Sequence, residues 1–198
     1  ITKHNILIKD IGQIEEAVSK AFYIANTGRP GPVLLDIPKD VFTSKMQYEP
    51  KLEYEFESKS KFQFDDFADK QACEVAELIN SAKRPLIYAG GGVKIAEASN
   101  SMFQLALKAG IPVVNSLMGL ATIDRGHQLS LGLVGMHGSR EANLAVTNCD
   151  LFIAIGARFS DRVIGDPKKF AQKANIIHLD IDETEIDKNI ETYLSYIC

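Results

Sequence analysis

Three consecutive glycines directly after a short apolar run limit what this chain can fold into. Residues 86–89 are apolar, Gly90, Gly91 and Gly92 follow, and residues 95–108 carry apolar side chains at helical spacing. A buried parallel strand, a tight turn and a helix in this order produce such a pattern. Glycine permits positive φ angles, and its missing Cβ lets backbone N–H groups approach a ligand. The sequence therefore predicts a turn that opens onto a helix N-terminus, a place that favours anions.

Further apolar runs and amphipathic segments alternate along the chain. Strands are predicted at residues 33–37, 86–89, 111–115, 131–133, 151–155, 176–182 and 193–197. Helices are predicted at residues 11–25, 69–82, 95–108, 141–148 and 184–189. This alternation is typical of α/β proteins, and we expect a doubly wound parallel sheet with helices on both faces.

By composition, the chain divides into three segments. Residues 1–41 predict one helix, capped by Asp10, and one strand, so we expect an N-terminal helix-strand remnant of a first domain. Residues 42–66 predict a surface linker, and residues 67–198 a second domain, truncated at its end. Both ends thus look cut from a longer protein. The aromatic side chains of the linker are expected to anchor it to its own domains; they are Tyr48, Tyr54, Phe56, Phe62 and Phe64.

Composition argues against several classes of protein. A net charge of −4 and a pI of about 5.6 offer no basic face for nucleic acid. No apolar run approaches the roughly 20 residues of a membrane span, and no signal-peptide pattern opens the chain. Cys73, Cys149 and Cys198 lack the spacing of a zinc site or of a disulfide framework, which fits the reducing cytoplasm.

In doubly wound sheets, ligands bind outside the C-terminal ends of the strands, so the residues at those ends are candidates. They are Gly90, Gly91, Gly92, Ser116, Leu117, Met118, Gly119, Gly135, Met136, His137, Gly138, Gly156, Ala157, Arg158, Asp180, Ile181 and Asp182. Several glycine-rich ends along one edge favour an extended ligand that carries phosphate.

Most of these candidates have a structural alternative to ligand binding. The glycine triplet is equally a tight turn, and Arg158 pairs either with a phosphate or with a surface acid. His137 is either a ligand contact or a solvated loop residue. Asp182 is expected to cap the next helix, and His178 to be a satisfied buried histidine.

Other motifs narrow the function less. Arg29 stands directly before Pro30, so it is rigidly presented, and we expect a ligand or interdomain role. A nucleophile elbow, an HExxH motif, a P-loop and clustered metal ligands are missing from the sequence, so it predicts no catalytic residue and no metal site. The residues themselves indicate a domain that binds a nucleotide-like cofactor, and a non-enzymatic nucleotide-binding module stays open. A plain NAD-binding domain is disfavoured because the GxGxxG order is absent.

Several motifs in series resemble one enzyme family. Residues 27–41 are similar to the end of the pyrimidine-binding domain of thiamine diphosphate enzymes, and residues 84–92 to the opening of their central domain. Six further segments closely resemble the catalytic (large) subunit of acetolactate synthase; they are residues 116–119, 135–138, 142–143, 149–150, 156–162 and 178–182. The resemblance covers nearly the whole chain apart from the linker.

The resemblance implies an activity, cofactors and partners. The activity is decarboxylation of pyruvate on thiamine diphosphate, followed by joining of the two-carbon unit to a second 2-oxoacid for branched-chain amino acids. Mg²⁺, a homodimer or homotetramer and a regulatory small subunit are implied for the parent. FAD is implied in the central domain, without a net redox role. Its contacts, carried over by motif, are Arg29, Gly90, Gly91, Gly92, Ser116, Leu117, Met118, Met136, His137, Gly156, Arg158, Arg162 and Asp180.

Some positions of the family are changed or missing here. Many members carry an acid where this chain has Ser160. The family's catalytic glutamate belongs upstream of Ile1, and its metal and diphosphate motif belongs after Cys198, so we expect these 198 residues to be inactive alone. We also expect a monomer or weak dimer with weak affinity for FAD. FAD-linked pyruvate oxidase and glyoxylate carboligase stay open as alternatives, as does a catabolic synthase without FAD.

Overall fold

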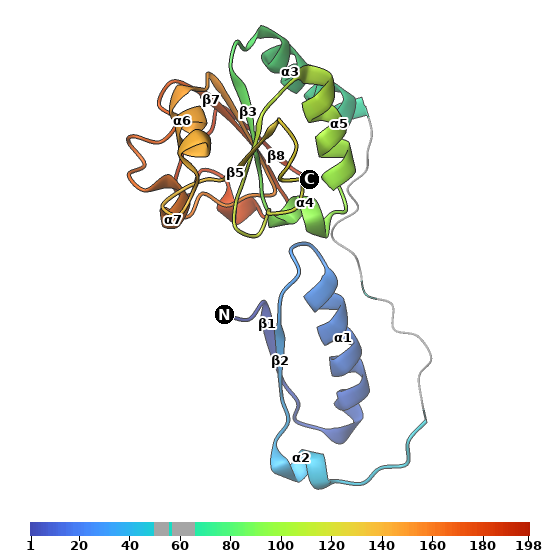
Figure 1. Cartoon of the computed structure of the whole chain (residues 1–198). Coiled ribbons are helices and arrows are strands. Elements are labelled where there is room, and N and C mark those ends of the chain that lie inside the picture. The colour runs from blue at the N-terminus through green and yellow to red at the C-terminus, as the bar shows by residue number, and fades with distance from the viewer. Residues whose placement is uncertain (50–55, 57–65) are drawn as a thin grey trace. The chain divides into compact units, whose positions relative to one another are not determined.

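The computed structural model describes residues 1–49, 56 and 66–198, without the side chains of residues 66–68. The chain forms two compact units, residues 1–63 and residues 64–198 (Figure 1). Each unit has its own core and is described by itself. The boundaries expected at residues 41 and 66 stay a prediction.

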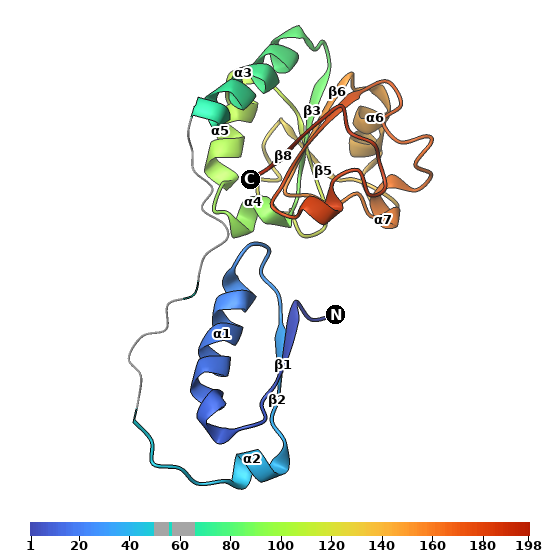
Figure 2. The ribbon, with the colours of Figure 1, turned by 180° about the vertical axis from the view of Figure 1, so that it is seen from behind.

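The first unit is a small β-α-β arrangement. It contains β1 (His4–Leu7), the 3-10 helix η1 (Ile11–Gln13), α1 (Ile14–Asn26), β2 (Val33–Asp36) and α2 (Lys39–Thr43). Strands β1 and β2 pair in parallel, and α1 lies alongside them in both views (Figures 1 and 2). Asp10 caps the start of the helical segment as predicted, since its Oδ1 accepts a hydrogen bond from Gly12 N at 2.8 Å.

Two elements of this unit were not predicted. Strand β1 is only four residues long and becomes recognisable through its pairing with β2. Helix α2 follows Pro38 and runs into the segment that was predicted to be a linker. Of the aromatic residues of that segment, Tyr48 donates to Glu15 Oε1 at 3.2 Å and Phe56 stacks on Tyr23 at 5.3 Å. Tyr54, Phe62 and Phe64 lie outside the described residues.

The second unit is a parallel sheet with helices on both faces. Its elements are α3 (Asp66–Ser81), β3 (Pro85–Ala89), α4 (Gly91–Ile95), α5 (Ser99–Ala109), β4 (Val113–Asn115), β5 (Ser130–Leu133), α6 (Arg140–Asn148), β6 (Leu151–Ile155), α7 (Asp161–Ile164), β7 (Asn175–Asp180), η2 (Glu183–Glu185) and β8 (Leu194–Ile197). The strand order is β5-β4-β3-β6-β7-β8, and every neighbouring pair is parallel. The doubly wound fold predicted from the sequence is confirmed.

Each face of the sheet has its own hydrophobic core, because successive side chains of a strand point to opposite faces. Leu86 and Tyr88 of β3 enter the core under α6 and α7, whereas Ile87 and Ala89 enter the core under α3 and α5. Both views show these helix pairs on opposite sides of the strands (Figures 1 and 2). The clean division explains why β3 and its neighbours read as continuous apolar runs.

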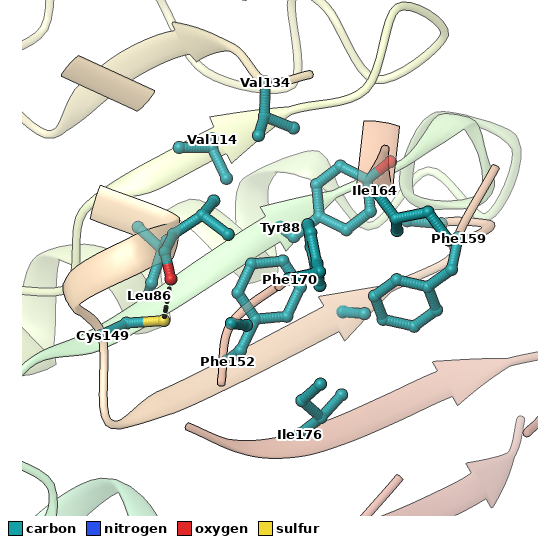
Figure 3. Packing of buried hydrophobic residues seen from close by; sticks show 14 of the residues in the cluster. Leu86, Tyr88, Val114, Val134, Cys149, Phe152, Phe159, Ile164, Phe170 and Ile176 are labelled. Carbon is teal, nitrogen blue, oxygen red and sulfur yellow. Dashed lines mark hydrogen bonds between the residues drawn. The ribbon is translucent and has the colours of Figure 1, made fainter. Parts of the chain in front are cut away.

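The core under α6 and α7 is rich in aromatic side chains and is called the aromatic core below. Figure 3 shows Tyr88, Phe152, Phe159 and Phe170 gathered on one face of the sheet. Phe152 meets Phe170 edge to face at 5.3 Å, and Phe159 meets Phe170 in the same way at 5.9 Å. Edge-to-face pairs add to the stabilisation that burial alone gives. Phe159 lies just beyond β6, so the aromatic core also holds the loop that leaves the sheet there.

The helix predicted at residues 95–108 is divided in the structure. Helix α4 starts within the glycine triplet and ends at Ile95, and α5 starts at Ser99. Glu97 lies between them with φ 55°, a left-handed conformation that stops a continuous helix. Helix α7 was not predicted, because four residues are too few to show helical periodicity. None of the helices in the described parts of the chain is long and apolar enough to cross a membrane.

Candidate functional site

The direction of strand order reverses between β3 and β6, which lie next to each other at the centre of the sheet. In doubly wound proteins, the crevice outside the C-terminal ends of such a pair is where ligands bind. Gly90 follows β3 there, and Gly156 follows β6. The topology therefore brings together two glycine segments that are far apart in the sequence.

The two glycine segments touch main chain to main chain. Gly92 N donates to Gly156 O at 2.9 Å, and Gly90 N donates to Ile155 O at 2.9 Å. A Cβ on Gly90 would lie 1.9 Å from Gly156 O, and one on Gly92 would lie 2.7 Å from Gly156 Cα. We call this contact of residues 90–92 with Gly156 the glycine crossing.

The glycine crossing corrects two expectations for the triplet. Positive φ is found at Gly156 (54°) and not at Gly90, Gly91 or Gly92, so Gly90 and Gly92 are required by the close approach of another backbone segment. The turn also opens onto the five-residue helix α4 and not onto the long helix that was expected to supply a dipole.

The loop after β4 packs on the same strand end. Ser116 N donates to Ala89 O at 3.0 Å, and a Cβ on Gly119 would lie 2.1 Å from that oxygen. Buried Asn115 fixes the loop because its Nδ2 donates to Gly119 O at 2.9 Å and to Thr122 Oγ1 at 2.8 Å. The loop presents Leu117 and Met118, which are 69% and 70% exposed.

The turn after β5 adds two more candidate side chains. Met136 is 69% exposed, and His137 is exposed as well. Met136 N donates to Arg162 O at 2.9 Å, so this turn is joined to α7. The side chain of Asn143 in α6 forms hydrogen bonds with both backbone groups of Gly135. Its Oδ1 accepts from Gly135 N at 2.9 Å, and its Nδ2 donates to Gly135 O at 3.0 Å.

Arg158 leaves the sheet just after the glycine crossing, and its side chain is exposed. Among the described residues, no acidic side chain lies within ion-pair distance of its guanidinium, so the surface ion pair considered above is not formed. Its carbonyl accepts from Tyr88 Oη at 3.3 Å. Burial raises the pKa of Tyr88 far above its usual range, against smaller lowering effects of Ser116 and Arg158, so the phenol stays a donor.

His178 of β7 contacts the loop that follows β6. It is 0% exposed, and its Nε2 lies 3.0 Å from Ala157 O, directly before Arg158. The expectation of a satisfied histidine is half correct, because Nδ1 has no hydrogen-bond partner among the described residues. Asp180 Oδ1 accepts from Asp182 N at 3.0 Å, and Asp182 caps η2 through Thr184 N, as predicted.

Next to Arg158 lies a cavity of about 330 Å³. It is lined by Arg158, Phe159, Ser160, Asp161, Glu185, Lys188 and Asn189. Lys188 pairs with Glu185 at 3.0 Å, and Asn189 Nδ2 donates to Phe159 O at 2.8 Å. No group of three or more potential metal ligands occurs among the residues that the structure describes.

The structure thus joins most of the candidates into one edge of the sheet. Residues 90–92, 116–118 and 156 meet around β3, and 136–137 are joined to Arg162 through one hydrogen bond. Arg29 lies in the first unit, and its assignment to this site stays a prediction. Sequence reasoning assigned no role to Asn115 and Asn143. An asparagine at the end of a strand or one turn into a helix was the signal that could have revealed them.

A comparison with protein families decides the affiliation. The model of the thiamine pyrophosphate enzyme central domain matches residues 73–198. The chain belongs to this family. The match contains the complete sheet from β3 to β8, and hence the glycine crossing and every candidate residue of the second unit.

Large subunits of acetolactate synthase are among the curated relatives of this family member. The probable large subunit of Methanocaldococcus jannaschii is 47% identical over 196 residues, which cover 96% of this chain and 32% of that relative. Isozyme 1 of Escherichia coli is 44% identical over 188 residues, 95% of this chain and 32% of that relative. The Corynebacterium glutamicum large subunit is 44% identical over 193 residues, 95% of this chain and 30% of that relative. The chain spans about a third of the length of the curated relatives it matches.

Proposed function

We propose that this chain is the FAD-binding central part of an acetolactate synthase large subunit. The glycine crossing at the switch point carries the proposal, because it builds the crevice in which doubly wound proteins hold a nucleotide cofactor. The relatives' printed names support the reaction. On this proposal residues 1–41 belong to a pyrimidine-binding domain, 42–66 to a linker and 67–198 to the central domain.

The parent enzyme would condense pyruvate with a second 2-oxoacid, pyruvate or 2-oxobutyrate, with loss of CO₂. Thiamine diphosphate and Mg²⁺ would supply the carbanion chemistry of that reaction. On this proposal, the residues of this chain bind FAD and orient it. The word "large" in the relatives' names supports a smaller partner subunit for the parent.

The residues at the edge of the sheet fit FAD. Leu117, Met118 and Met136 offer apolar side chains to solvent, which suits a flat aromatic ring system. Arg158 offers a guanidinium without an acidic partner among the described residues, which suits a diphosphate. The glycines of the glycine crossing carry no side chains, so the edge of the sheet between these two groups stays accessible to a ligand. In the family that the chain resembles, FAD takes no net redox part, so binding is what these residues have to provide.

Titration of the 198-residue chain with FAD, followed by flavin fluorescence, tests the proposal. We expect saturable binding that weakens about tenfold in Arg158→Ala, because one charge-assisted hydrogen bond is lost. His137→Ala is expected to weaken binding in the same direction.

Lys108→Ala is the matched control, since it removes an exposed cation at the end of α5, beside the start of β4. Its affinity for FAD should stay within about twofold of the wild type. Failure of the wild-type chain to bind FAD at millimolar concentration, or equal loss in Lys108→Ala, would contradict the proposal.

A further inference from the structure

Few hydrogen bonds within the turn of residues 135–138 fix its backbone conformation. Gly135 has φ 105°, and Gly138 N closes the turn on Gly135 O at 2.9 Å. The two side chains that the turn presents, Met136 and His137, are both exposed. Ser139 N also donates to Leu133 O at 2.8 Å and closes the segment that contains the turn, but within the turn the bond between half-buried Gly138 and Gly135 leaves the exposed tip weakly fixed.

Asn143 supplies the missing constraint from outside the turn. Its amide bonds the N–H and the C=O of Gly135 at 2.9 and 3.0 Å, as a neighbouring peptide group would. The start of α6 is itself fixed to β5, because Ser139 Oγ accepts from Ala142 N at 3.1 Å and donates to Leu131 O at 2.7 Å. Through Ser139 and Asn143, the backbone of Gly135 is therefore held at a fixed position relative to β5.

The turn in its place also meets α7. Met136 N donates to Arg162 O at 2.9 Å, and a Cβ on Gly135 would lie 2.5 Å from the same oxygen. A rotation of the Gly135 peptide groups would break this contact. The distance between His137 and Arg162 thus depends on the amide of Asn143.

We propose that Asn143 is a positioning residue of the cofactor site, which fixes Met136, His137 and Arg162 in the arrangement that receives the flavin nucleotide. This inference rests on the proposed FAD site. Asn143 does not touch the cofactor itself and acts through the backbone of Gly135.

Only an amide side chain of this length suits the two bonds. Aspartate would still accept from Gly135 N, but its second oxygen would face Gly135 O, and two acceptors repel. Serine is too short and leaves both backbone groups to water. Substitution by either residue should release the turn without emptying the hydrophobic core.

The test measures FAD affinity, the visible circular dichroism of bound FAD and the melting temperature of Asn143→Asp and Asn143→Ser. We expect the dissociation constant to rise about tenfold and the flavin spectrum to change even at saturation. A loss of stability alone would not change the spectrum of the bound flavin. If Asn143→Asp does not fold, Asn143→Ser carries the test.

Val146→Ala, on the same helix, is the control. Val146 is buried in the aromatic core and makes no contact with the turn through a hydrogen bond, so its truncation lowers the melting temperature. Its dissociation constant should stay within about twofold of the wild type. The inference is overturned if both Asn143 variants bind FAD like the wild type with an unchanged spectrum, or if Val146→Ala weakens binding as much. Absence of FAD binding in the wild type would instead overturn the proposed function.

Discussion

Glycine is required at positions 90, 92 and 156 because the backbone of another segment of the chain occupies the space that a side chain would need. The sequence showed the triplet and the separate Gly156, and their places at strand ends were predicted. Their mutual contact was not predictable, because it depends on which strands become neighbours. The usual reason for glycine in a turn, a positive φ, applies to Gly156 alone among them.

Gly90→Ala should lower the free energy of unfolding by about 3 kcal/mol or more, because the new methyl group would lie 1.9 Å from Gly156 O. Urea denaturation followed by circular dichroism measures the change. Gly126→Ala is the control, since its nearest neighbour would be Asp124 Oδ1 at 3.7 Å, and it should change stability by less than about 0.5 kcal/mol. Equal stability of the two variants would show that the crossing tolerates a side chain.

At the scale of elements, the long apolar runs were the reliable signal. β6 was predicted with the bounds that it has, and β7, predicted at residues 176–182, runs from Asn175 to Asp180; both signals are clear because both faces of each strand are buried. The short elements β1, α2 and α7 were missed, since their residues gain stability from packing and not from periodicity. The strand-end candidates lie along one edge of the sheet for the same reason that the sheet was predictable, and their role in binding stays a prediction. The asparagines that hold the loops of this edge were overlooked, because a single asparagine at a strand end or in the first turn of a helix is a weak signal.

Asp150 joins two elements at the opposite, N-terminal edge of the sheet. Its carboxylate accepts from Lys83 N at 2.9 Å and from Arg84 N at 2.8 Å, and thereby ties the start of β6 to that of β3. Desolvation acts to raise the pKa of Asp150, but these backbone hydrogen bonds together lower it below its ordinary value of 3.8.

The stability that Asp150 contributes should therefore depend on pH. A lowered folded-state pKa means that the contribution is complete above the unfolded-state pKa of 3.8 and is lost as the pH falls through the folded-state value. Asp150→Asn should be less stable than the wild type at pH 7, by less than about 1 kcal/mol, because the group is partly exposed. Urea denaturation at pH 7 and pH 3 should show this difference shrink. A difference that stays constant or grows toward pH 3 would contradict the assignment.

At the scale of the whole molecule, the proposed function assigns to this chain the binding of a cofactor, and no catalytic residue was predicted from its sequence. On the proposed function, the glycine crossing, the exposed methionines and Arg158 hold the cofactor. Among the described residues, no cluster of potential metal ligands accompanies them. The sequence likewise shows no nucleophile or acid–base constellation.

We expect the 198-residue chain to bind FAD and to form no acetolactate from pyruvate, even with thiamine diphosphate and Mg²⁺ added. The reason is that the family motifs for activation of thiamine and for its diphosphate have no counterpart in this sequence. A colorimetric assay for acetoin after acid decarboxylation measures the product, with FAD binding in the same preparation as proof of folding. Measurable acetolactate from the purified chain would prove the expectation wrong.

Contact between two backbones also restricts how this protein can be re-engineered. A clash between side chains can be relieved by a second substitution, but a Cβ that meets a carbonyl oxygen at the glycine crossing can be relieved only by rerouting the chain. Suppressor mutations elsewhere are therefore not expected to rescue a substitution at Gly90 or Gly156. The loops after β3 and β6 form one module, and a chimera assembled from two relatives should inherit both from the same parent.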